Sequence, residues 1–190
     1  GITLNGSDVS AWADSSENSF NMVQATATEQ PAYNSGAIEF TPADTHNLGS
    51  ASDITLSGAF TIGIKLNIAA VGGIIIGDNT ETGEFFRFHS TTILRIKIDN
   101  ATADVQLDSG VWGGGYMVVT RNASNVITLW WNGVKQTTAT PTQSGTANID
   151  TIGVRKTDLN AYDGTISEIQ IFDTESSAIT ANVNTYLSNI

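Results

Sequence analysis

The chain has 190 residues, of which 40% are hydrophobic and only 14% are charged, well below the roughly 25% of charged residues in an average soluble domain. Asp and Glu outnumber Lys and Arg by 19 to 8, and the resulting formal net charge of -11 argues against nucleic acid and anionic membrane surfaces as partners. Because the chain contains no cysteine, a disulfide framework, a thiol nucleophile and a cysteine-based zinc site are excluded.

The length and the even composition predict a single domain that covers residues 1–190. The N-terminus lacks the basic region and apolar stretch of a secretory signal. The longest apolar run, over residues 68–77, is about half of the roughly 20 residues that a membrane-spanning helix needs, so we expect a buried strand there.

Apolar and polar residues alternate along much of the chain, which is typical of β-strands with one buried face. The clearest example is the stretch 59–68, where every second residue from Phe60 to Ile68 is apolar, and we expect it in the middle of a sheet. The expected strands cover, in chain order, residues 37–40, 59–68, 73–77, 85–89, 93–98, 116–121, 126–131, 149–154 and 165–172. Turns rich in Asn, Asp and Gly separate them, and the glycines at 113–115 are expected to form a loop.

Helical spacing occurs only near the C-terminus, where Ile179, Val183 and Leu187 fall on one helix face and a Ser or Thr within residues 174–177 can cap the first turn. Because helices between the strands are missing, a parallel α/β sheet is excluded. We therefore predict an all-β fold, a two-sheet antiparallel jelly-roll sandwich with a short C-terminal helix packed at one edge.

Three segments of the chain carry a family resemblance. The first reads WADSSEN over 12–18, then QATA over 24–27 and QPAY over 30–33, and the second runs from IEF at 38–40 to FTI at 60–62. The third comprises VTR at 119–121, TLWWNG at 128–133 and GTISEIQIF at 164–172. In this order and spacing, the segments resemble the concanavalin A-like (laminin G-like) family of jelly-roll domains.

The resemblance implies a surface-exposed domain, because domains with this opening recur on bacteriophage virion proteins and bacterial surface proteins. It also implies that calcium can bind at a rim of the sandwich. Members with this opening usually carry one further strand upstream, so we expect the chain to be a trimmed or processed product. An unpaired sheet edge at that place would be able to accept a segment of another protein.

Enzymatic chemistry is not expected. The family's glucanases use an E-x-D-x-x-E strand, which this sequence lacks, and the densest acidic region, residues 78–84, is typical of a hairpin loop. The two histidines, His46 and His89, do not lie in a triad or nucleophile-elbow pattern, and the chain has no phosphate-binding loop motif.

Calcium is the cofactor that the sequence leaves open, since hard cations need carboxylate and carbonyl oxygens from several loops. Asp44, Asp78 and Asn79 are the nearest candidates, but they form no compact ligand string, and capping of turns is the favoured interpretation.

Carbohydrate binding on such sandwiches rests on exposed aromatic rings beside polar side chains. Strand alternation places Trp131 in the core and Trp130 with Thr128 on the outer face, where they can form a sugar platform. The alternative is that Trp130 packs under a neighbouring loop or subunit. Trp112, beside the glycine run, is a second loop aromatic with the same two interpretations, whereas Trp12 is expected to be structural.

We therefore predict a non-catalytic recognition or adhesion module, which binds a glycan or surface polysaccharide, displayed outside the cell on a virion or a bacterial surface. The alternative is a virion structural or decoration protein that acts only through contacts with other virion or surface proteins, and a homo-oligomer is compatible with that role.

Overall fold

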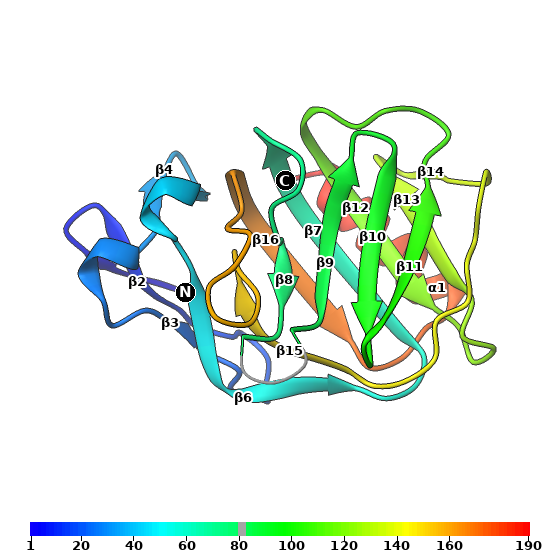
Figure 1. The fold of residues 1–190 in the computed structure, drawn as a ribbon, viewed down its shortest axis with the longest axis horizontal. Helices are drawn as coiled ribbons and strands as arrows, with labels where there is room; N and C mark the ends of the chain where they lie inside the picture. Colours follow the sequence, from blue (N-terminus) through cyan, green and yellow to red (C-terminus); the bar gives the residue numbers. More distant parts are fainter. Residues whose placement is uncertain (80–82) are drawn as a thin grey trace.

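Antiparallel strands make up most of the regular structure in the computed structural model, which describes residues 1–79 and 83–190 (Figure 1). The front layer of Figure 1 contains β6 (Leu48–Leu56), β8 (Ile76–Gly77), β9 (Phe85–Ser90), β10 (Ile93–Ile98), β11 (Ala101–Gln106) and β15 (Ala147–Ile152). The layer behind it contains β5 (Ala37–Phe40), β7 (Phe60–Ile68), β12 (Gly113–Arg121), β13 (Ile127–Trp131), β14 (Val134–Lys135) and β16 (Gly164–Phe172).

A group of short N-terminal strands connects the two layers at one side. It consists of β1 (Ile2–Asn5), β2 (Asp8–Trp12), β3 (Met22–Val23) and β4 (Ala32–Asn34). Strand β3 pairs with β6 of the front layer, and β4 pairs with β5 of the back layer, so hydrogen bonding is continuous from β11 to β14. A short 3-10 turn, Ala27–Glu29, lies between β3 and β4, and a second, Pro42–Asp44, lies between β5 and β6.

The core lies between the two layers. The apolar residues of β7 from Phe60 to Ile68 are all buried, as the alternation predicts. Edge-to-face ring contacts cross the interface: Phe60 contacts Phe86 at 6.1 Å between ring centroids, and Phe88 contacts Trp131 at 5.5 Å. The predicted all-β sandwich with a short C-terminal helix is therefore confirmed.

The C-terminal helix α1 (Ser177–Ser188) lies over the outer face of β7 and β12, and not at an edge of the sandwich as predicted. Its Val183 and Leu187 form a second apolar cluster with Tyr116 and Val118. The helix packs on this face because Gly63 presents no side chain there. Ser176 caps the first turn, as one of the predicted caps, since its Oγ accepts a hydrogen bond from the Ile179 amide at 3.2 Å.

Among the described residues, no helix is both long enough and apolar enough to span a membrane.

The glycines at 113–115 belong to strand β12, so the prediction of a loop there is wrong. They pair with residues 66–68 of β7. The physical reason is space: a Cβ at Gly115 would lie 2.7 Å from both the Trp131 ring and the Asn132 Oδ1. Glycine therefore lets the strand pass the tryptophan, although an isolated glycine run predicts irregular structure.

Several boundaries also differ from the predicted ones. Only residues 76–77 of the predicted strand 73–77 pair in the sheet, because the Ile74 amide bonds to the Asn160 carbonyl in a loop. The strand expected at 149–154 lies at 147–152. Strands β1 to β4, β6, β11 and β14 fall outside the predicted ranges. Each of them contains no more than two buried residues, which explains why a regular apolar alternation is missing there.

Candidate functional site

Trp130 and Thr128, the predicted sugar platform, lie on the outer face of β13, and the predicted burial of Trp131 on the opposite face is confirmed. Trp130 is half-buried and packs against the apolar cluster under helix α1. The Lys135 ammonium lies 5.8 Å from the centroid of its ring. Trp130 is therefore partly covered from within the chain by the cluster under helix α1, and neither a loop nor a subunit covers it among the described residues; its role in a sugar platform stays a prediction.

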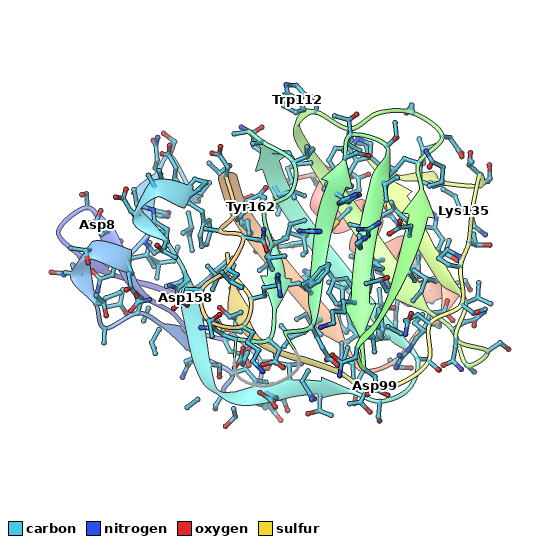
Figure 2. All side chains as sticks on the ribbon, viewed as in Figure 1. Asp8, Asp99, Trp112, Lys135, Asp158 and Tyr162 are labelled. Atoms are coloured by element: carbon cyan, nitrogen blue, oxygen red, sulfur yellow. The ribbon has the colours of Figure 1, made fainter. Side chains whose placement is uncertain are left out.

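Trp112 is the most exposed large apolar side chain, with 64% of its surface accessible, and it projects from the upper end of the molecule in Figure 2. It ends the loop between β11 and β12. That loop is anchored at both ends: the Val111 amide donates to the Thr91 carbonyl at 2.7 Å, and the Asp108 carboxylate accepts from the amides of Thr137 and Thr138. The backbone on either side of Trp112 is thus anchored, while the indole itself is exposed to solvent.

A hollow of about 420 Å³ lies at the same end of the sandwich. One wall of the hollow is the loop at 70–73, which follows the end of β7 at Ile68. Ile68 pairs with Gly113, the residue directly after Trp112, so the hollow and Trp112 lie at the same end of the sandwich. The polar side chains along the hollow are Arg87 and His89 from β9, and Asn160 and Asp163 from the loop before β16.

The loop at 160–163 is fixed by Tyr162, which is buried beside the hollow. Its hydroxyl donates to the Asn67 carbonyl at 3.0 Å, and its ring meets Phe40 edge to face at 6.0 Å. Burial raises the pKa of Tyr162, so the phenol stays protonated and keeps this hydrogen bond. Asn160 and Asp163 are therefore positioned by a rigid core residue.

Arg87 contributes a guanidinium group to the hollow. Its Nη1 donates to the Gly72 carbonyl at 3.2 Å, and its guanidinium lies 4.9 Å from the Phe85 ring centroid. Its Nε is buried and has no hydrogen-bond partner among the described residues. Burial, followed by the like charges of Arg95 and Arg155, lowers the pKa of Arg87, although an arginine stays charged at neutral pH. Unpaired buried donors are rare in purely structural positions.

Asp108 gives a pH-dependent test of the loop that carries Trp112. Hydrogen bonds from Thr138, and then from Thr137, lower the pKa of Asp108 below its ordinary value near 3.8. A carboxylate whose pKa is lower in the folded state stabilises the fold at pH values above its unfolded-state pKa. This stabilisation is lost as the pH falls through the folded-state pKa. We expect Asp108→Ala to be less stable than the wild type at about pH 6, and we expect this difference to be smaller at about pH 2. Urea unfolding at both pH values measures this, and an equal difference at both would contradict it.

The calcium candidates occupy two different settings. Asp44 lies in the 3-10 turn 42–44 and contacts His46, with 3.8 Å between carboxylate and imidazole. Asn79 donates through its backbone to Asp150 at 2.7 Å and through its side chain to Asp158 at 2.9 Å, and Asp78 beside it is buried. Within 1–79 and 83–190, no three carboxylate or imidazole groups converge as a metal site. Calcium binding stays a prediction.

The acidic region at 78–84 contains no exposed carboxylate pair in its described part. Glu84 is buried and accepts backbone hydrogen bonds from Asp99 and Asn148, so it ties strands together. Glu81, the other glutamate of this region, lies outside the described residues. Of the two histidines, His46 bonds to the Thr41 amide and His89 lines the hollow.

Four residues of the hollow were not among the predicted site residues: Arg87, His89, Asn160 and Asp163. A signal for the first two exists in the strand at 85–89, where Arg87 and His89 alternate with buried Phe86 and Phe88 and so face outward. Asn160 and Asp163 carry no such signal, because only the fold brings their loop to β9.

The fold resembles solved structures at low sequence identity. The binding domain of Paraclostridial Mosquitocidal Protein 1 has a TM-score of 0.59 at 12% identity, over 99% of this chain and 51% of that chain. A candidate carbohydrate-binding protein from Bacteroides ovatus has a TM-score of 0.56 at 14% identity, over 77% of this chain and 46% of that chain. The third structure is domain 4 of AbnA, an extracellular arabinanase from Geobacillus stearothermophilus, in complex with arabinotriose. It has a TM-score of 0.52 at 13% identity, over 88% of this chain and 80% of that chain.

The chain spans about half the length of the first two structures. No protein-family model matches the sequence, and no curated protein matches it. At 12–14% identity, these structural likenesses show the fold alone.

Proposed function

We propose that the chain is a non-catalytic carbohydrate-binding module that binds glycan at the end of the sandwich that carries Trp112 and the hollow. The observation that carries the proposal is the presence, at this one end, of an exposed indole on an anchored loop and of a hollow lined by Arg87, His89, Asn160 and Asp163. The hollow, at about 420 Å³, falls in the size range of small-molecule sites.

The residues have complementary roles in this proposal. Trp112 offers its ring face to the apolar face of a sugar, as aromatic side chains do in carbohydrate recognition. Arg87 and Asn160 donate hydrogen bonds to sugar oxygens, while the Asp163 carboxylate accepts from hydroxyl groups. The proposed role is binding alone, and among the described residues Asp163 is the one carboxylate that lines the hollow, whereas glycoside hydrolysis requires a pair.

The structural neighbours support this function by analogy. One is the binding domain of a mosquitocidal protein, one a candidate carbohydrate-binding protein, and one a domain in complex with arabinotriose. The resemblance to concanavalin A-like domains supports the same function and adds the location, the surface of a virion or of a bacterium. Fold-level analogy of this kind raises the expectation but identifies no sugar.

Trp112→Ala is expected to weaken glycan binding by about tenfold, because the stacked ring is lost while the fold is unchanged. The measurement is direct binding of the wild type and the variant to a broad glycan panel, once with calcium and once with chelator. Trp130→Ala is the matched control, and we expect the folded variant to bind as the wild type does. Unchanged binding by Trp112→Ala, with loss in folded Trp130→Ala, would move the site to the face of β13, and loss with chelator would implicate the rim carboxylates.

A virion structural or decoration protein that acts through protein contacts alone is the second candidate function. One observation favours it: Ile169 and Ile171 of β16 are only half-buried, and β5 pairs only with residues 164–166 of this strand. The absence of saturable binding to any glycan in the panel would favour this candidate.

A further inference from the structure

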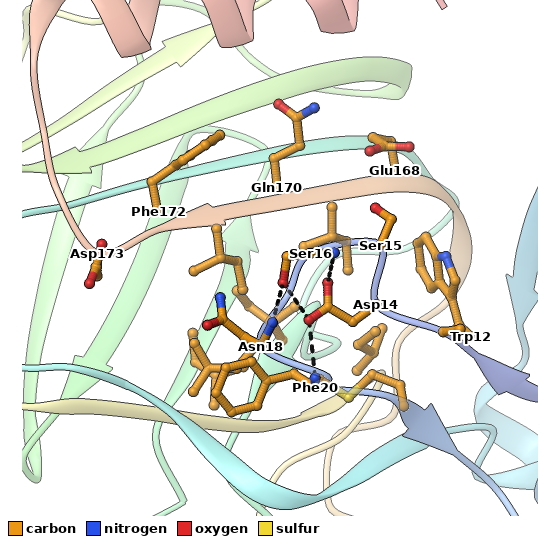
Figure 3. A pocket seen from close by; sticks show the side chains of 18 of the residues that line it. Trp12, Asp14, Ser15, Ser16, Asn18, Phe20, Glu168, Gln170, Phe172 and Asp173 are labelled. Atoms are coloured by element: carbon orange, nitrogen blue, oxygen red, sulfur yellow. Dashed lines mark hydrogen bonds between the residues drawn. The ribbon is translucent and has the colours of Figure 1, made fainter. Parts of the chain in front are cut away.

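One lateral side of the sandwich, between β6 in one layer and β16 in the other, is open. A cavity of about 840 Å³ follows this opening, and Figure 3 looks into it. Core residues such as Leu56, Ile76 and Ile149 line it, and the loop that follows Trp12 forms another wall. The core residues themselves stay buried at this side, and the partly exposed apolar residues of the opening include Ile169 and Ile171.

Strand β16 has an edge that only its first residues use. On one side, β7 pairs with it from Gly164 to Phe172. On the other side, β5 pairs only with Gly164–Ile166, and no described strand pairs with the five residues Glu168–Phe172. This open stretch is about 17 Å long, the length of an average strand.

The side chains at the open edge have an alternating pattern. Ile169 and Ile171 face the core cluster and are only half-buried, whereas Glu168, Gln170 and Phe172 face the opposite side, as Figure 3 shows for the latter three. Open backbone groups next to a half-covered apolar row form a template for one more strand.

We propose that this groove binds an extended peptide segment of a partner protein, which adds to β16 in line with β5 and carries alternating apolar and basic residues. The apolar residues of the added strand would cover Ile169 and Ile171 and fill the cavity, because residues of one strand alternate between faces. The basic residues would lie on the other face, beside Glu168.

The charged side chains of the groove favour a basic partner. Asp14, Glu168 and Asp173 line it, and the lining within the described part of the chain contains no Lys, Arg or His. The Gly1 amino group, which also lines it, donates to the Ala13 carbonyl. Burial raises the pKa of the Glu168 carboxyl group. Among the described residues, no salt bridge involves Glu168. Lys65 lies opposite it on β7, but its ammonium group donates to the Leu187 carbonyl. A cross-strand Lys or Arg would stabilise the Glu168 carboxylate.

The same charges argue against a second copy of this chain as the occupant. Two β16 edges paired with each other would bring Glu168 and Asp173 of one copy close to those of the other. Like charges in such proximity disfavour pairing. The net charge of -11 adds to this repulsion.

The test uses three synthetic peptides and the whole chain. The first peptide alternates Lys with Ile or Val over seven residues, the second has Glu in place of each Lys, and the third has Pro at the central Ile. We expect saturable binding of the first peptide, at least about tenfold weaker binding of the second, and none of the third, which cannot complete the strand pairing. Hydrogen exchange should slow at the open-edge amides of residues 168–172 when the first peptide binds.

Two variants locate the binding. Glu168→Gln should weaken binding of the Lys peptide several-fold without an effect on folding, because the residue is at the surface of the strand. Ile171→Ala should weaken all peptide binding. Equal binding of the Lys and Glu peptides, exchange protection elsewhere, or a dimer of the wild-type chain whose formation protects the amides of 168–172 would each overturn the proposal. Glycan binding at the hollow is measured separately and is independent of these outcomes.

Discussion

Replacement of Arg121 by alanine is expected to lower the free energy of unfolding by about 3–5 kcal/mol. The Arg121 side chain is fully buried, and its guanidinium donates to four carbonyl oxygens, those of Gly58, Gly145, Leu56 and Gln143 at 2.7, 2.8, 2.9 and 3.4 Å. It also stacks over the Phe60 ring at 4.9 Å. Alanine would leave these carbonyls without partners and open a cavity at one end of the core.

Arg121 thus joins segments that are far apart in the sequence: β12, which carries it, the turn between β6 and β7, and the loop before β15. Urea unfolding of the wild type and Arg121→Ala measures the effect. The exposed Lys135 supplies the matched control, because Lys135→Ala should cost less than about 1 kcal/mol. A loss of less than about 1 kcal/mol in Arg121→Ala as well would mean that the carbonyls find water or other donors.

Gly63→Val is expected to destabilise the fold by about 1–3 kcal/mol through overpacking. A Cβ at Gly63 would collide with the Val183 Cγ1 and lie 3.0 Å from the Leu187 Cδ1. Helix α1 would have to move away from β7, and the apolar cluster beneath it would open. At this chain length, each kcal/mol corresponds to roughly 2–4 °C in the melting temperature.

Gly114→Val is the matched control for this substitution. It lies in the neighbouring strand β12, and a Cβ there meets no atom within 4 Å. Because valine suits a strand, we expect unchanged or slightly higher stability. Thermal unfolding of both variants, with circular dichroism at 222 nm, distinguishes the cases. Equal melting temperatures for the two variants would show that the helix accommodates the side chain without cost.

The sandwich could be predicted from the sequence because its central strands are buried on one face. In β7, β9, β10 and β13 the alternation is regular, and the predicted bounds agree with the observed ones within one residue. The N-terminal strands could not be predicted from periodicity, since they are short and mostly exposed. The prediction of a loop at residues 113–115 was wrong for a different reason. A Cβ at Gly115 would collide with Trp131 on the neighbouring strand, and this contact cannot be seen in the sequence.

The site is less predictable than the fold. Trp112 could be identified as a loop aromatic, but its exposure could not be separated from that of Trp130 until the position of helix α1 was known. The alternation of residues 127–131 correctly separated Trp130 from the core, yet it carries no information on what covers the outer face. The hollow is formed by Pro42 and by segments at 70–73, 87–89 and 160–163, whose proximity is a property of the tertiary structure.

The proposed glycan site is tested most directly by NMR chemical-shift mapping with the tightest ligand of the glycan panel. We expect perturbation of the Trp112 indole N–H and of the Arg87, His89 and Asn160 signals, with the Trp130 indole unchanged. Saturable binding that perturbs Trp130 and leaves the hollow unaffected would contradict the assignment, and no perturbation by any glycan would contradict carbohydrate binding itself.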